Sequence, residues 1–217
     1  MKTLDKDRAR TTEEYIEELK EALTRNPDCG TSHYNLAVAF IKQGRWDEAV
    51  HELKEAIQSS PSLAEAYVDL GGIYFQRGDL EGCIHLNREA LKIRPRFSVP
   101  HGNLGFAYLQ QGDIESAVES LEKAMAINPQ FVQALATLGS AYFMQGRLEE
   151  SIAASQKALQ MAPTFAVAHN NLALAYFEKG EFRKAVAHCD QASSYGFSVD
   201  PRFLELVEPH RNTSEQA

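Results

Sequence analysis

The chain has 217 residues, of which 44% are hydrophobic and 24% charged, and it carries a formal net charge of -8. This composition can bury a continuous core, which argues against intrinsic disorder. The acidic balance argues against a nucleic-acid partner, because proteins that bind phosphate backbones usually carry a basic field. We therefore expect a partner that is apolar or basic.

The sequence also bears on where the protein works. No window approaches the length of a membrane-spanning segment, and the first fifteen residues lack the apolar stretch of a signal peptide. Cys29, Cys83 and Cys189 form no CxxC pair and are odd in number, which fits a reducing compartment. We expect a cytoplasmic protein without membrane insertion, in which Cys83 and Cys189 are small core residues.

The chain is predicted to begin with a polar segment and a single helix. Residues 1–10 are polar, and we expect them to be flexible. Residues 11–29 contain a helix with Tyr15, Leu19 and Leu23 on one face. That face would cover the apolar side of the next element, so the segment is predicted to be an N-terminal capping helix.

Residues 30–199 repeat with a period of 34 residues. A fixed period of this length is that of a two-helix unit whose neighbours stack to bury their apolar faces. The predicted repeats are 30–63, 64–97, 98–131, 132–165 and 166–199. The period is clearest in a proline column and a glycine column, formed by Pro27, Pro61, Pro95, Pro129 and Pro163 and by Gly44, Gly78, Gly112, Gly146 and Gly180.

Each repeat contains the pattern of two packed helices. Positions 4, 7, 8 and 11 form one stripe of the first helix, with Leu always at position 7 and Ala or Gly at position 8. The small residue lets the second helix approach closely. Glycine at position 15 predicts a left-handed cap for the first helix, and proline at position 32 stops the second.

Residues 200–217 are predicted to form a C-terminal capping helix and a polar tail. Asp200 and Pro201 are an N-cap followed by a first-turn proline, and Phe203 and Val207 share the apolar face of the helix. A terminal repeat needs such a cover for its apolar side.

These columns resemble the tetratricopeptide repeat family over roughly residues 30–199, because spacing and residue type agree in five consecutive units. The resemblance implies an all-α, right-handed αα-superhelix with a capping helix at each end. Two features depart from the family pattern. Position 4 is His33, His101 and His169 in the odd repeats, and Phe197 replaces the position-32 proline of repeat 5.

No catalytic motif accompanies the repeats. A phosphate-binding glycine loop, a nucleophile elbow, HExxH and paired-cysteine motifs are all missing from the sequence, so we expect no catalytic residue, metal site or cofactor. The position-4 histidines are predicted to pack or to bond between helices. His51, His85 and His188 are predicted to be solvated on the outer face, and Trp46 to lie in the core.

The predicted binding site is a groove on the first helices, at positions 2, 5, 6, 9, 12 and 13. An exposed row this poor in charge usually marks a binding site, although bulky residues at position 12 and Asn at position 6 are common in the family. Position 9 is bulky in odd repeats and small in even ones, which predicts pockets at Gly72 and Ser140. The predicted peptide-binding residues are Tyr34, Asn35, Val38, Ile41, Asp69, Gly72, Phe75, Asn103, Phe106, Leu109, Ser140, Phe143, Met144, Asn170, Asn171, Leu174 and Phe177.

Two binding modes of the family can be compared with this groove. Some relatives grip a C-terminal carboxylate with Lys at position 5 and Asn at position 9, where Tyr34 and Val38 stand here, so no carboxylate clamp is expected. Asn35, Asn103 and Asn171 resemble the asparagine ladder of the O-linked N-acetylglucosamine transferase superhelix. Only that binding mode is implied, because the chain has no glycosyltransferase domain.

The sequence favours a protein-interaction module over an enzyme. We expect a chaperone-like adaptor or assembly factor that binds an apolar or amphipathic segment of another protein or peptide in its concave groove. The alternative is a self-associating structural scaffold, a homo-oligomer in which one molecule receives the terminal helix of another. Solution mass across a concentration series separates these two hypotheses.

Overall fold

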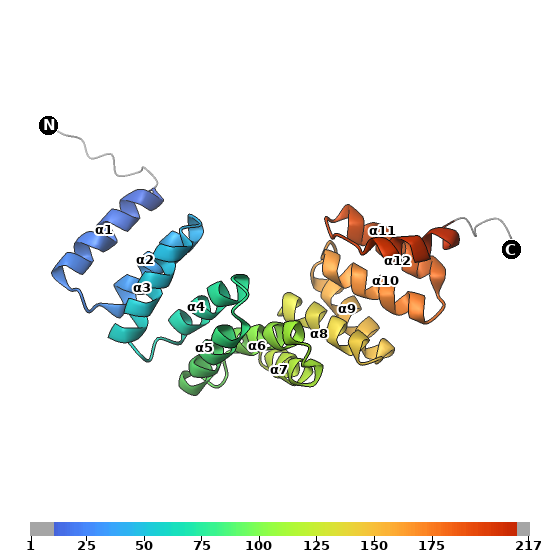
Figure 1. Ribbon diagram of the computed structural model, residues 1–217, viewed down its shortest axis with the longest axis horizontal. Helices are drawn as coiled ribbons and strands as arrows, with labels where there is room; N and C mark the ends of the chain where they lie inside the picture. The colour runs from blue at the N-terminus through green and yellow to red at the C-terminus, as the bar shows by residue number, and fades with distance from the viewer. Residues whose placement is uncertain (1–10, 212–217) are drawn as a thin grey trace. The chain divides into compact units, whose positions relative to one another are not determined.

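The computed structural model describes residues 11–211. The segment 1–10, which we expected to be flexible, and the end of the polar tail, 212–217, lie outside the described residues. The described part consists of twelve α-helices and one 3-10 helix and contains no strand (Figure 1). This all-helical architecture confirms the predicted fold class. The chain divides into two compact units, residues 1–95 and 96–217, called here the N-unit and the C-unit.

The N-unit is a chain of helices in which each packs against the next. Thr11 caps its first helix, since its hydroxyl accepts from the Glu14 N–H while the Glu14 side chain accepts from the Thr11 N–H. The helices of the N-unit are α1 (Thr12–Arg25), α2 (Gly30–Lys42), α3 (Trp46–Ser59), α4 (Ala64–Gln76) and α5 (Leu80–Ile93).

The C-unit has two layers of helices followed by a short cap. The first helices α6, α8 and α10 contact one another in that order, and the second helices α7, α9 and α11 pack against them. The cap consists of α12 and the 3-10 helix η1, both of which contact α11. The elements are α6 (Ser98–Gln111), α7 (Ile114–Ile127), α8 (Val132–Met144), α9 (Leu148–Met161), α10 (Ala166–Glu178), α11 (Phe182–Ser194), α12 (Pro201–Val207) and η1 (Glu208–His210).

The glycine columns have the roles that the sequence predicted. The glycine that follows each first helix has a positive φ, for example 72° at Gly44 and 80° at Gly112, so a side chain there would be strained. At position 8, a Cβ added to Gly105 would lie 2.4 Å from the side chain of Leu121 on the facing helix. Small residues at this position are therefore required by the close approach of the two helices.

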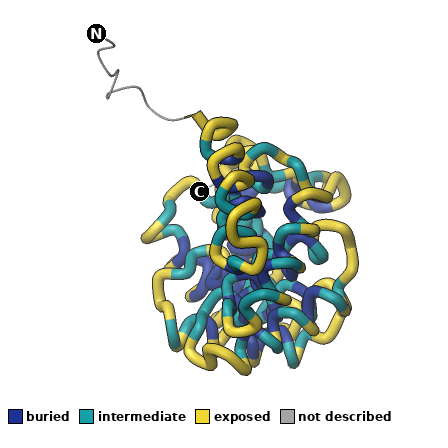
Figure 2. The backbone as a smooth tube through the Cα atoms, turned by 90° about the vertical axis from the view of Figure 1, so that its left-hand side faces the viewer, coloured by how far each residue is buried: buried dark blue, intermediate teal, exposed yellow. Residues whose placement is uncertain are grey.

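Burial follows the predicted stripes, with one exception. Buried positions lie inside the helix pairs and exposed positions lie mainly in turns and on outer faces (Figure 2). Cys83 and Cys189 are fully buried, as predicted, and burial raises the pKa of the Cys83 thiol to about 11. Trp46 is 39% exposed, so its placement in the core was wrong. It is the first residue of α3, at the open end of the helix pair.

Candidate functional site

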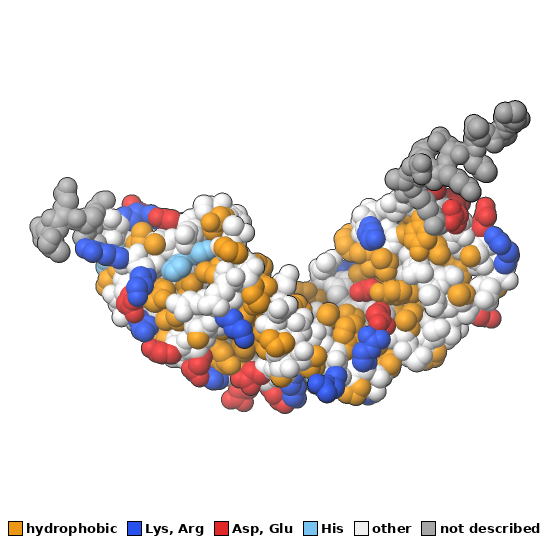
Figure 3. Space-filling model, turned by 180° about the vertical axis from the view of Figure 1, so that it is seen from behind, with side chains coloured by type: hydrophobic (Ala, Val, Ile, Leu, Met, Phe, Trp, Pro, Cys, Tyr) orange, Lys and Arg blue, Asp and Glu red, His pale blue; other side chains and the backbone are white. Residues whose placement is uncertain are grey.

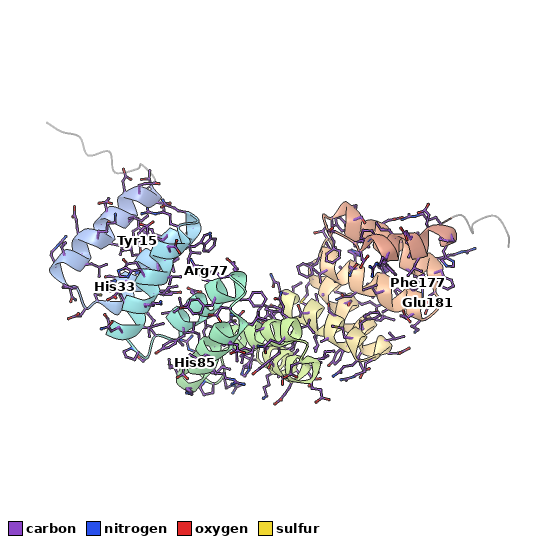
Figure 4. The ribbon with its side chains drawn as sticks, in the orientation of Figure 1. Tyr15, His33, Arg77, His85, Phe177 and Glu181 are labelled. Atoms are coloured by element: carbon purple, nitrogen blue, oxygen red, sulfur yellow. The ribbon has the colours of Figure 1, made fainter. Side chains whose placement is uncertain are left out.

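The position-4 histidine of repeat 1 joins two helices and a loop. His33 on α2 bonds through Nδ1 to Glu52 on α3 at 2.6 Å and through Nε2 to the carbonyl of Pro27 at 2.8 Å (Figure 4). Both partners accept hydrogen bonds, so the ring is held best as an imidazolium with both nitrogens donating. Burial disfavours that charge, but the bonds to Glu52 and Pro27 and the nearby Glu55 raise the pKa of His33 overall. We call this arrangement the repeat-1 clamp.

The equivalent histidine of repeat 5 has a different partner. His169 on α10 bonds through Nε2 to the carbonyl of Pro163 at 2.9 Å, and its Nδ1 lies 3.0 Å from Nδ1 of His188 on α11. Since Pro163 can only accept, neutral His169 donates through Nε2 and accepts at Nδ1 from the His188 N–H. We call this arrangement the repeat-5 clamp.

Two predictions about histidines can now be scored. Bonding between helices is confirmed for His33 and His169, and His51 and His85 are exposed, as predicted. The solvated position predicted for His188 is wrong. Its ring is half-buried and stacks on Tyr176 with centroids 5.7 Å apart; burial lowers its pKa, followed by the charges of His169 and Lys184.

The asparagine predicted to face the groove in repeat 5 lies inside the fold. Asn171 is 3% exposed; its Nδ2 donates to the carbonyl of Ala136 at 2.7 Å, and its Oδ1 accepts from Ser140 at 2.9 Å. Both ends of the amide are therefore used between α8 and α10. The idea that Asn171 and Ser140 present a donor, an acceptor and a pocket to a ligand is wrong at this step. The small residue at position 9 of repeat 4 instead makes room for the asparagine of repeat 5.

The predicted groove residues of the N-unit divide into joined and open ones. The hydroxyl of Tyr34 donates to the carboxylate of Asp69, which ties α2 to α4; burial raises the pKa of both groups. A Cβ added to Gly72 would meet no atom within 4 Å, so the surface there is open. Asn35 and Val38 also remain open, because they line a cavity.

That cavity of the N-unit, of about 440 Å³, is closed on one side by α1. Sequence reasoning missed this contribution, although the register of Tyr15 in the capping helix could have revealed it (Figure 4). Ile41 and Phe75 are half-buried at the ends of α2 and α4. The cavity is lined by Thr11, Thr12, Tyr15, Asn35, Val38, Ala39 and Lys42.

The predicted groove residues of the C-unit form an apolar face on α6, α8 and α10. Phe106 and Leu109 pack partly against the core of α8, and Phe143 packs partly against α10. Met144 is 54% exposed. Hydrophobic patches without intervening charge are visible in the space-filling view, where charged side chains gather mainly along the lower rim (Figure 3).

The C-terminal cap changes the last part of the predicted groove. Phe177 on α10 contacts the rings of Phe182, Phe203 and His210 at centroid distances of 5.2, 5.5 and 6.0 Å, so it is packed under the cap and not free for a ligand (Figure 4). A cavity of about 690 Å³, called here the cap pocket, lies beside it. The cap pocket is lined by Asn170, Leu174, Phe197, Ser198, Val199, Asp200, Pro201, Arg202, Phe203 and Leu206.

Two of the cap-pocket residues, Arg202 and Leu206, were missed by sequence reasoning. Leu206 is 54% exposed, because α12 has only seven residues and no second helix covers it. The position of Leu206 on a short final helix was the one available signal. In the described range 11–211, no group of three or more metal-ligating side chains comes together, and no helix is long and apolar enough to cross a membrane.

Comparison with known families decides the relationship of the chain. Residues 3–195 match the family model described as the cilia and flagella-associated protein 70 C-terminal domain, which consists of tetratricopeptide repeats. The chain belongs to this tetratricopeptide repeat family. Tetratricopeptide domains are protein-interaction modules and are generally not enzymes, which agrees with the coarse function predicted from the sequence.

Solved tetratricopeptide structures have the same fold. YrrB is 19% identical with a TM-score of 0.71, and the match covers 89% of this chain and 99% of that one. Residues 41 to the end of MamA from Desulfovibrio magneticus are 24% identical with a TM-score of 0.68, covering 77% and 95%. PilF from Pseudomonas aeruginosa is 18% identical with a TM-score of 0.71, covering 88% and 82%. A search of curated proteins finds no significant match.

Proposed function

We propose that this tetratricopeptide protein is an adaptor or assembly factor that captures an apolar or amphipathic segment of a partner protein. The observation that carries the proposal is the C-unit face, on which Phe106, Leu109 and Phe143 are half-buried and Met144 is 54% exposed without an interleaved charge. An exposed apolar row of this kind favours association with another surface.

Two further observations support a peptide ligand. The N-unit cavity combines the open amide of Asn35 with apolar Val38, so it offers both polar and apolar contacts. YrrB, one of the structural neighbours, is described as a tetratricopeptide protein with an unusual peptide-binding site. The three cysteines are unpaired in the structure, and this supports work in the cytoplasm.

The test is selection of a displayed random-peptide library on the intact chain, followed by affinity measurement of the enriched peptides. Replacing Phe106 and Phe143 by Ala should weaken binding by about 2 kcal/mol, roughly 30-fold, because central aromatic anchors dominate such interfaces. Met144→Glu provides a second variant whose exposed site does not bear on folding. Enriched peptides that bind both variants with unchanged affinity would show that this face is not the binding site.

Self-association uses the same measurements. A second copy of the chain is itself a protein partner with an amphipathic segment, and sedimentation over a concentration series detects it directly. A mass that stays monomeric at every concentration rules out the homo-oligomer and leaves a heterologous partner.

A further inference from the structure

The C-unit face has few polar groups left for pairing with a ligand main chain. Asn171 and Ser140 are bonded to each other, and the Asn171 amide also donates to the carbonyl of Ala136. Asn103 already has a partner. Thr137 is then the polar side chain that remains near the middle of α8, and one hydroxyl cannot pair with the main chain of a whole segment.

This shortage limits the conformation of the bound segment. An extended segment would turn main-chain N–H and C=O groups toward Phe106, Phe143 and Met144, and these groups would lose water without gaining a partner. A helix satisfies the same groups internally and presents only side chains. The apolar face is therefore better matched to a helix than to an extended peptide.

The dimensions of the face agree with a short helix. Its three first helices lie side by side, and packed helices are about 8–10 Å apart, so the face is roughly 20 Å wide. At 1.5 Å per residue, a helix of about 13 residues crosses that width. At the α10 edge it reaches the cap pocket, where Leu174, Phe203 and Leu206 surround space for one large apolar side chain.

We propose that the C-unit binds an amphipathic helix of a partner protein, with one large apolar side chain anchored in the cap pocket. The inference rests on the proposed function and adds the conformation and the anchor. The apolar stripe of the helix lies on Phe106, Phe143 and Met144, and its polar face remains in water. The internal bond between Asn171 and Ser140 is what distinguishes this mode from an asparagine ladder that grips an extended chain.

The library selection distinguishes the two levels. Peptides of about sixteen residues, enriched on the intact chain and depleted on the Phe106→Ala, Phe143→Ala variant, should carry apolar residues at i, i+3 or i+4, and i+7. The synthesised peptide should gain helical circular dichroism on binding. Peptides with period-two or proline-containing motifs that still depend on the aromatic residues would overturn the helix and leave the proposed function standing. No enrichment, or equal binding to the double variant, would overturn both.

A matched pair of exposed substitutions tests the anchor. Leu206→Ser alters the cap pocket, whereas Met161→Ser alters an exposed apolar residue at the end of α9 that does not line it. We expect at least a tenfold loss of affinity for the selected peptide with Leu206→Ser and no change with Met161→Ser. Equal affinity of both variants would remove the cap pocket from the site. Thermal melting of both proteins shows whether either change affects folding.

Discussion

The two clamps hold equivalent positions in opposite states of charge. In each, a position-4 histidine bonds through Nε2 to a proline carbonyl and through Nδ1 to position 23 of the second helix. Position 23 is Glu52 in repeat 1 and His188 in repeat 5. The carboxylate stabilises a charged ring, whereas the second imidazole shares one proton with the first. One residue on the neighbouring helix therefore sets how each unit responds to pH.

The signs follow from the pKa shifts. The pKa of His33 is raised in the fold, so the repeat-1 clamp contributes its full stability below the ordinary pKa and loses it as the pH rises through the folded pKa. The pKa of His188 is lowered in the fold. The repeat-5 clamp is therefore stable above the ordinary pKa and loses stability as the pH falls toward the folded value. Acidification should strengthen the N-unit and weaken the C-unit.

The largest expected effect comes from the cap, which the N-unit does not share. Phe203 is buried against Phe177 and the end of α11, so Phe203→Ala should cost about 3–5 kcal/mol of C-unit stability. Leu206→Ala, on the exposed side of the same helix, should cost less than about 1 kcal/mol. Hydrogen exchange on the intact chain assigns the loss to α10, α11 and α12 and should leave α2 and α3 unaffected. Similar protection in both variants would contradict the predicted role of the cap.

The next effect comes from converting one clamp into the other. His188→Glu places a carboxylate opposite His169, so both ring nitrogens gain acceptors and the ring should become charged. A hydrogen bond to a charged group is worth about 1.5–3 kcal/mol, and we expect the C-unit to become more stable at acidic pH by an amount within that range. Hydrogen exchange of α10 and α11 at pH 5 and pH 8 measures it.

The control for this conversion is His188→Gln, which offers an acceptor without charge. Lys184 lies close to position 188 and would also attract a carboxylate, so the pH dependence, not stability at one pH, is the informative quantity. His188→Gln should remove the acid sensitivity without reversing it. If His188→Glu leaves the C-unit as acid-sensitive as before, the charge of the position-23 residue does not control the clamp.

A smaller effect is expected from the reverse change in the N-unit. Glu52→Gln keeps an acceptor for His33 but removes the negative charge, so the pKa of His33 should fall. The N-unit should lose about 1 kcal/mol below pH 6 and almost nothing above pH 8, where the ring is neutral in either protein. Histidine ring titration by NMR reports the pKa directly, and an unchanged titration curve would contradict this assignment.

The helix pairs were predictable from sequence because their causes repeat. Leu at position 7, a small residue at position 8 and glycine at position 15 act within one repeat, and five copies average out local exceptions such as Trp46. The clamps were harder to foresee. His188 and Glu52 occupy the same column, but the sequence gives no sign that this column faces position 4.

The site was predicted only in part, because its residues act across repeats. The alternation at position 9 was visible, yet the sequence could not show that Ser140 is small to admit Asn171, which lies 31 residues away. Phe177 was read as a ligand group because nothing in its own repeat covers it. The aromatic residues of a cap that begins twenty-three residues later bury it.

The smallest expected effect separates the asparagines of the two units. Asn171 bonds to Ala136 and Ser140 inside the C-unit, so Asn171→Ala should lower the stability of α8 and α10 by about 1 kcal/mol. Because its amide does not reach the open face, the affinity of a selected peptide should fall less than threefold at saturating folding conditions. Asn35→Ala should show the opposite pattern, since Asn35 lines an open cavity: unchanged stability, and weaker binding of any peptide that occupies the N-unit. Thermal melting and titration of both variants in parallel provide the comparison. A large loss of affinity in Asn171→Ala, with stability intact, would restore the asparagine ladder and require the bond to Ala136 to open when the ligand binds.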